Sequence, residues 1–232
     1  MKKFGLPERQ GLYNPAKERD SCGFGFVANI KNHKSHAVVQ QGLSVLGCLT
    51  HRGGAGADPL AGDGAGILIQ IPDKLLRDEC QAIDIQLPPE GDYGVGMIFL
   101  PKDEKARANC EKSIENLIIK EGLSVLGWRD LPTDNSWLSE SVCDIEPFIR
   151  QIFIGKTDKF KDRYAFEIKL FVIRKQSHQL VSLEKLAGEE AFYITTMSSY
   201  TICFKGMMLP NRVSKYYTDL QDPRLESALA LV

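Results

Sequence analysis

Strand-like apolar runs occur in pairs along this chain of 232 residues, with helical stripes between them, and this order limits the folds that it can form. Runs typical of strands cover residues 22–28, 66–71, 94–100, 123–128, 148–154 and two stretches within 191–204. Apolar residues three and four apart, typical of helices, cover 35–49, 103–118, 160–174 and 212–220. A regular βαβ repeat would alternate the two types one by one. The order therefore favours an α+β fold of two packed sheets flanked by helices.

The first 21 residues differ in character from the rest of the chain. They are polar, contain two prolines and show no helical or strand periodicity. From Cys22 onward, apolar residues alternate with glycines, which predicts the first strand. We therefore expect an extension over residues 1–21 and one folded domain over 22–232.

Composition restricts the class of protein and of partner. Hydrophobic residues make up 43% and charged residues 25% of the chain, which is typical of a folded soluble protein. The 29 basic and 30 acidic residues give a net charge of -1, so no strong field attracts nucleic acid or an anionic membrane. The N-terminal residues contain no apolar stretch typical of a signal peptide, so we expect none, and no apolar run reaches the ~20 residues that span a bilayer. We expect a cytoplasmic protein that binds neither nucleic acid nor membrane.

The six cysteines are widely spaced, with no C-x-x-C pair. This pattern predicts neither a metal site nor a disulfide scaffold, and favours a reducing compartment.

The hexapeptide GLSVLG occurs twice, at residues 42–47 and 122–127. The flanking sequences do not match, and the first copy lies in a helical stripe whereas the second reads as a strand. We expect a coincidence and not an internal duplication. At the other end of the chain, residues 228–232 are an apolar run that looks interrupted within an element, so we expect the domain to be cut at its C-terminus.

Cys22 has two interpretations from the residues alone. A cysteine that begins a strand is most often a small core residue. If the peptide bond before it were cut, however, the freed α-amino group, with a pKa near ~8, could act as base for the Cys22 thiol.

Arg52 also has two interpretations, since it could bond the last carbonyls of its helix or hold a carboxylate with its planar guanidinium. His51 beside it reads as structural, and Gly53 as the residue that ends the helix. The glycine-rich segment 62–66 superficially resembles a nucleotide loop. It precedes an apolar strand and not a helix, so a nucleotide site is not predicted.

Several segments together resemble a known family. These are GLYNPAKERDSCGFGFVANI, SHAVVQQGLSVLGCLTHRGGAGADPLAGDGAGILIQIPD, FKGMMLP and DPRLESALALV. They are similar to successive parts of the amino-terminal glutaminase domain of glutamate synthase large subunits, which are class II glutamine amidotransferases. The resemblance implies the N-terminal nucleophile (Ntn) hydrolase fold, an αββα sandwich, here incomplete.

The resemblance also implies a reaction. Residues 1–21 would be a propeptide, and Cys22 would become the N-terminal nucleophile. Its thiolate would attack the side-chain amide of L-glutamine, form a γ-glutamyl thioester and release ammonia, and water would then release glutamate. Arg52 would bind the α-carboxylate of glutamine.

The same resemblance gives weaker roles to the residues around Arg52. His51 and Gly53 would shape the substrate-binding loop. Asp58 and Asp63 would fix its backbone.

In the complete family enzyme, ammonia aminates 2-oxoglutarate at a second site that holds FMN and an iron–sulfur cluster. With widely spaced cysteines and no barrel-length sequence remaining, we expect neither group in this chain. The implied partners are the remainder of the large subunit and a small reductase subunit or ferredoxin. The electron donor, NADPH, NADH or ferredoxin, stays open.

One departure from the family concerns activity. Family members carry an Asn-Gly pair that forms the oxyanion hole, and this sequence contains no such dipeptide. Losing one oxyanion donor typically lowers the rate by ~10²- to 10³-fold, so we expect the chain alone to be nearly inactive. Tyr200 stands in a turn where relatives commonly carry a basic residue.

Two other hypotheses stay open. The chain could be a non-catalytic split or degenerate fragment in which Cys22 is a core thiol and the leader is never removed. It could also belong to another amidotransferase of the same fold. The long leader argues against the latter, because those relatives usually begin their nucleophile just after the initiator methionine.

Overall fold

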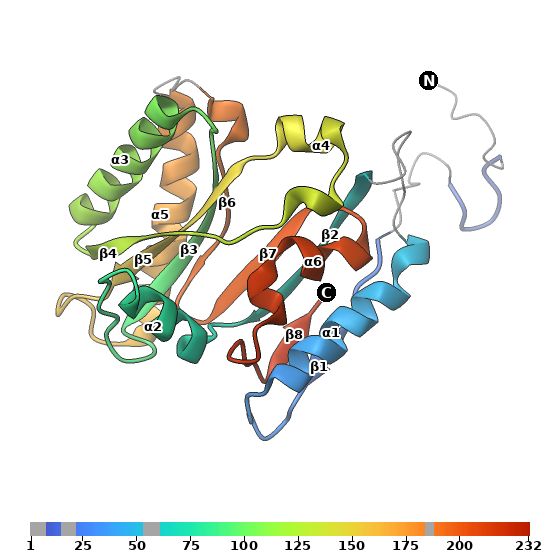
Figure 1. Ribbon diagram of the computed structural model, residues 1–232, viewed down its shortest axis with the longest axis horizontal. Helices are drawn as coiled ribbons and strands as arrows, with labels where there is room; N and C mark the ends of the chain where they lie inside the picture. The colour runs from blue at the N-terminus through green and yellow to red at the C-terminus, as the bar shows by residue number, and fades with distance from the viewer. Residues whose placement is uncertain (1–7, 15–21, 53–60, 184–187) are drawn as a thin grey trace.

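Two four-stranded antiparallel sheets form the centre of the protein (Figure 1). The computed structural model describes residues 8–14, 22–52, 61–183 and 188–232. The first sheet has the strand order β1-β8-β2-β7 and the second has the order β4-β5-β3-β6. The strands are β1 Phe26–Ala28, β2 Ala61–Gln70, β3 Tyr93–Leu100, β4 Ser124–Asp130, β5 Phe148–Gly155, β6 Tyr193–Ser198, β7 Thr201–Met208 and β8 Leu229–Leu231.

Helices lie outside the two sheets. They are α1 His36–Cys48, α2 Asp73–Gln81, α3 Glu104–Lys120, α4 Glu140–Ile145, α5 Arg163–Leu183 and α6 Val213–Tyr216, with 3₁₀ turns η2 Thr50–Arg52, η3 Asn135–Trp137, η4 Glu189–Ala191, η5 Pro210–Arg212 and η6 Thr218–Gln221. Figure 1 shows α3 and α5 beside the second sheet and α1 beside the first. The sequence-based expectation of an αββα arrangement is confirmed.

Local signals explain the longer helices. Asp103 caps α3, because its carboxylate accepts a hydrogen bond from the Ala106 N–H at 2.8 Å. Cys110, Ile114 and Ile118 then place one stripe in the core against the second sheet. For α1, Ser35 is the residue before the first turn, as predicted, but its side chain makes no capping hydrogen bond.

One apolar cluster joins both sheets and three helices, α1, α2 and α6. It contains Ile67 and Phe204 of the first sheet together with Val95 and Phe153 of the second, all at most 1% exposed. Side chains of α1 and α2 belong to the same cluster. The two sheets therefore form one folded unit.

The hairpin of β6 and β7 passes from one sheet to the other. Two strands were expected here with a turn near Ser198 and Ser199, and the turn lies one residue later, at Ser199 and Tyr200. β6 pairs with β3 whereas β7 pairs with β2. The Thr195 hydroxyl lies 3.2 Å from the carbonyl oxygens of Met97 in β3 and Cys203 in β7. These two contacts connect the second sheet to the first at this point.

Some predicted boundaries were wrong. β1 covers only Phe26–Ala28 and not 22–28, although Gly25 also exchanges backbone hydrogen bonds with Val232. β2 begins at Ala61 and not at 66, because β7 also pairs with the glycine-rich segment. α5 extends to Leu183, and the helix expected over 212–220 is a series of short turns.

The two copies of GLSVLG adopt different structures, as predicted. The first lies inside α1. The second begins in the turn after α3 and continues into β4. Identical hexapeptides therefore take the structure that their surroundings stabilise.

Of the extension before Cys22, residues 8–14 are described and contain a turn closed by Gln10 and Tyr13. The domain boundary at Cys22 stays a prediction. Among the described segments, no helix combines the length and apolar character needed to cross a bilayer.

Candidate active site

Cys22 is exposed and lies three residues before a fixed point of the backbone. The Gly25 N–H donates to the Val232 carbonyl at 2.9 Å, and the Val232 N–H donates to the Gly25 carbonyl at 2.8 Å. A Cβ atom on Gly25 would lie 2.7 Å from Cγ1 of Val45 in α1. Glycine is therefore needed here for α1 to pack against the segment that carries the Cys22 thiol.

The end of α1 lies at the same end of the first sheet as Cys22, since Val45 packs on Gly25. The 3₁₀ turn Thr50–Arg52 follows, and the His51 Nδ1 donates to the Cys48 carbonyl at 3.0 Å. His51 thus satisfies a carbonyl at the helix end, which supports a structural role.

The other predicted residues of this loop are only partly within the structure. The backbone of Arg52 belongs to the 3₁₀ turn. Gly53 and Asp58 lie outside the described residues, as does the interaction predicted between Arg52 and a carboxylate. The structure therefore places Cys22 and the His51 turn at one end of α1, and the roles of Arg52 and Gly53 stay predictions.

The glycine-rich segment forms a bulge at the same end of the first sheet. Ala61 pairs with Met208 and Ala65 with Gly206, so three residues of β2 lie opposite one residue of β7. A Cβ atom on Gly62 would lie 2.7 Å from the Met208 carbonyl, so the two strands approach closely only through glycine. Asp63 lies in this bulge and is exposed. Because the segment is part of a strand, the rejection of a nucleotide loop agrees with the structure.

Thiol chemistry is restricted by burial. Burial raises the pKa of Cys80 to about 12 and also raises the pKa of Cys203. Cys110 is fully buried and Cys143 is partly buried, whereas Cys22 and Cys48 are exposed. Since the thiolate is the reactive form, Cys80 and Cys203 are poor nucleophiles near neutral pH.

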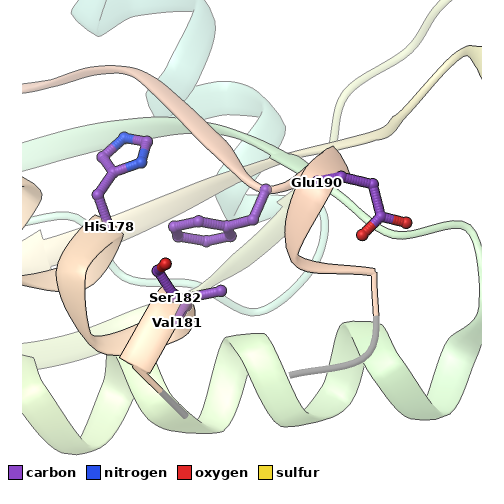
Figure 2. A pocket seen from close by; sticks show the side chains of 5 residues that line it. His178, Val181, Ser182 and Glu190 are labelled. Atoms are coloured by element: carbon purple, nitrogen blue, oxygen red, sulfur yellow. The ribbon is translucent and has the colours of Figure 1, made fainter. Parts of the chain in front are cut away.

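A hollow beside the C-terminal part of α5 contains residue types typical of hydrolases but lacks the geometry of a catalytic site. Figure 2 shows His178 and Glu190 on opposite sides of it, with Ser182 between them on α5. His178 Nε2 accepts the Ile194 N–H at 3.3 Å, and burial lowers the pKa of the imidazole. Within the described ranges, no hydrogen bond joins His178 to Ser182 or Glu190, so this is not a nucleophile–base pair.

The structure contains no candidate metal site in the described residues, where no three His, Cys, Asp or Glu side chains are placed to share an ion. An iron–sulfur cluster needs several cysteine ligands close together, and it does not fit this part of the chain.

Sequence reasoning missed two features outside the predicted site. Arg129 of β4 and Asp219 of η6 form a buried ion pair, and no local signal connects residues 90 positions apart. Sequence reasoning also gave no role to Tyr200, whose ring lies under the Arg163 guanidinium at 3.9 Å from the centroid. The stacked arginine fixes this turn against α5.

Comparison with known proteins agrees with these features. The family described as class-II glutamine amidotransferases matches residues 22–232. The chain is 46% identical over 227 residues to a glutamate synthase [NADPH] large chain of Bacillus subtilis, and 98% of the chain is covered. It is 36% identical to the chloroplastic ferredoxin-dependent glutamate synthase 2 of Arabidopsis thaliana and 36% identical to a glutamate synthase [NADH] of Saccharomyces cerevisiae, with 97% and 98% of the chain covered.

The matched stretch is a small part of these relatives. The chain spans 14%, 14% and 11% of their lengths, respectively. The family match itself covers most of the chain and begins at the exposed Cys22. On these grounds, the chain belongs to the class-II glutamine amidotransferases.

Proposed function

We propose that this chain is the glutaminase part of a glutamate synthase and that Cys22 is its nucleophile. One observation carries the proposal: the family match begins at Cys22, which is exposed and held close to a fixed strand pair. Removal of residues 1–21 frees the Cys22 α-amino group, which takes the proton of the thiol. The thiolate then attacks the amide carbon of L-glutamine, the α-ammonium group returns the proton to the amide nitrogen, and the C–N bond breaks to release ammonia as the γ-glutamyl thioester forms.

Hydrolysis completes the cycle. Water attacks the thioester carbon, the sulfur leaves and accepts a proton, and glutamate is released. Arg52 binds the substrate α-carboxylate through its two parallel N–H donors. His51 and Gly53 hold the backbone of this turn, and the hydrogen bond from His51 to the Cys48 carbonyl supports that role.

Ammonia is used elsewhere in the larger enzyme, by amination of 2-oxoglutarate. FMN and an iron–sulfur cluster belong to that part in our proposal, together with a small reductase subunit or ferredoxin. The relatives carry three different electron donors in their names, NADPH, ferredoxin and NADH. The donor is therefore decided outside this stretch of sequence. A cytoplasmic location belongs to the same proposal.

Labelling tests the nucleophile. The full chain is produced in cells, its intact mass is measured, and it is treated with a diazoketone analogue of glutamine. We expect loss of residues 1–21 and one label on Cys22. The variant Cys22→Ala should take up no label, whereas Cys48→Ala, which removes the other exposed thiol, should be labelled like the wild type.

Because this chain has no Asn-Gly pair, the labelling is repeated with the chain joined to the sequence that follows the matched stretch in the Bacillus subtilis relative. We expect faster labelling and glutamine hydrolysis in the joined protein. An intact leader with an unlabelled Cys22 in both proteins would reject the glutaminase and leave a non-catalytic fragment as the better account.

Saturation of the labelling tests Arg52. The variant Arg52→Lys keeps the charge but loses the planar pair of donors, so half-saturation should need about tenfold more analogue. The variant His51→Asn should change half-saturation much less. Equal effects of the two substitutions would contradict a direct contact between Arg52 and substrate.

A further inference from the structure

A groove between α4 and the end of β7 has no role in the proposed reaction. Its volume is about 310 Å³, at the lower end of typical small-ligand sites. The FKGMMLP segment forms one wall through Lys205 and Met208. β7 is separated from β1, the strand that follows Cys22, by two other strands of the sheet. We call this space the Lys205 groove.

The floor and rim of the Lys205 groove are apolar. Ile149, Met208 and Tyr217 line it and are buried, which makes its floor rigid. On the rim, Ile145 is 80% exposed and Met207 is 72% exposed. Exposed apolar side chains beside an apolar hollow are typical of a binding surface.

Lys205 provides the one cation of the described lining. Its ammonium donates to the Tyr193 hydroxyl at 2.8 Å and lies 4.5 Å from the centre of that ring. It has no ion pair with an acidic residue in the described part of the chain. An ammonium has three donors, so Lys205 can still bond an anionic ligand. The same contact lowers the pKa of Tyr193.

The acidic residues of the lining restrict the ligand's charge. Both carboxylate oxygens of Glu146 accept bonds, one from the Tyr216 hydroxyl at 2.6 Å and one from the Asn135 amide at 3.2 Å. Glu190 also lines the groove and is exposed. These two carboxylates would repel a second negative charge on a ligand. A single anionic group at Lys205 is what the groove can accept.

We propose that the Lys205 groove binds a small monocarboxylate with an apolar body. Its carboxylate accepts a hydrogen bond from the Lys205 ammonium, and its hydrocarbon part lies over Ile149 and Met208. The site goes beyond the proposed glutaminase reaction and needs no chemistry at Cys22.

Octanoate is the test probe, and methionine methyl groups report where it binds. The chain has five methionines, of which Met207 and Met208 line the groove, whereas Met97 and Met197 are buried elsewhere. The protein is labelled with ¹³C at its methionine methyls and titrated with octanoate. We expect saturable shifts of the Met207 and Met208 signals and an unchanged signal from Met197, which belongs to the other apolar cluster.

Two comparisons test the charge. The variant Lys205→Gln should bind octanoate about tenfold more weakly, as expected for a lost charge-assisted hydrogen bond. The variant Lys215→Gln is the matched control, because Lys215 lies over Trp137 outside the lining, and it should bind like the wild type. Octanamide should bind the wild type about tenfold more weakly than octanoate does. Its affinity for Lys205→Gln should equal its affinity for the wild type.

A rise of the Tyr193 pKa in Lys205→Gln, with an unchanged melting temperature, shows that this variant is folded and has lost the Lys205–Tyr193 contact. The variant Cys22→Ala should bind octanoate normally, so failure of the glutaminase proposal leaves this result intact. Absence of saturable shifts at millimolar octanoate, or equal octanoate affinity in wild type and Lys205→Gln, would overturn the proposal.

Discussion

Arg129 and Asp219 form a bidentate ion pair in the interior of the protein. The Arg129 Nη1 and Nη2 atoms donate to the two oxygens of Asp219 at 2.7 and 2.9 Å, and each side chain is 6% exposed. Nη1 also donates to the Gln151 amide oxygen at 3.0 Å. Burial alone would lower the pKa of Arg129, but the Asp219 and Glu79 carboxylates outweigh it, so the net pKa is raised. This pair connects β4 of the second sheet to the segment that leads into β8.

Removing one partner of this pair should be costly. In Asp219→Asn the buried Arg129 guanidinium loses its two short bonds and keeps only the partly exposed Glu79 carboxylate at 3.4 Å, so we expect a loss of about 3 kcal/mol in the free energy of unfolding. Urea denaturation measures it. The control is Asp222→Asn, whose partner Arg224 is 35% exposed and where we expect at most about 1 kcal/mol. Equal losses in the two variants would contradict the buried pair.

Gly25 should tolerate no side chain while Val45 is present. In Gly25→Ala the new Cβ would lie 2.7 Å from Val45 Cγ1, and we expect a loss of about 1–3 kcal/mol. The double variant Gly25→Ala with Val45→Ala removes the clashing atom. Its loss of unfolding free energy should be smaller than the sum of the losses in the two single variants. Gly47→Ala is the control, because nothing lies within 4 Å of its Cβ and alanine favours the helix. Additive losses in the double variant would show that the predicted clash is absent.

Stability should fall steeply in alkali. Burial raises the pKa of Cys80, Tyr93, Tyr216 and Tyr217 above the values these groups have in an unfolded chain. As the pH rises, these groups therefore lose their protons in the unfolded state before they do so in the folded state. Above its unfolded pKa, each group lowers the free energy of unfolding by up to about 1.4 kcal/mol per pH unit. This stability is fully present below about pH 9 and decreases above it.

Urea denaturation between pH 7 and 11 measures this dependence. The variant Tyr217→Phe has no hydroxyl to titrate, so its stability should fall less steeply above the tyrosine pKa of about 10. It also loses the bond from the Tyr217 hydroxyl to the Lys205 carbonyl, so it starts from a lower value at pH 7. Parallel curves for wild type and variant would exclude Tyr217 as a source of the effect.

The elements predicted correctly are those that local sequence specifies. α3 has its Asp103 cap and an apolar stripe of five buried residues within one segment. α2 was missed because its nine residues bury only Leu75, Leu76 and Cys80, too few to show a period. The start of β2 was missed because Gly62 has no strand preference and is held there by Met208 of β7, which is distant in sequence.

The candidate site also has features that local sequence predicts and features that depend on packing. Cys22 could be selected because the change of composition and the glycine pattern both occur at that residue. The place of His51 at the end of α1 followed from the helical stripe and is confirmed. Local patterns could not show that the end of α1 packs against the segment that follows Cys22, since this depends on the contact of Val45 with Gly25. The distance between residues on different helices and strands depends on how these elements pack, and local sequence patterns do not predict it.

Tyr200, to which sequence reasoning gave no role, packs against Arg163, the first residue of α5. Arg163 stacks on its ring and also donates from Nε to the Ser199 hydroxyl at 3.3 Å. Tyr200→Phe keeps the ring and should leave the stability unchanged, whereas Tyr200→Leu removes it and should lose about 0.5–1 kcal/mol. In an Arg163→Met background this difference should disappear, because the cation is gone. Denaturation of the four single and double variants gives the coupling energy between the two side chains. An equal difference between Phe and Leu in both backgrounds would assign the effect of Tyr200 to ring burial and not to the arginine.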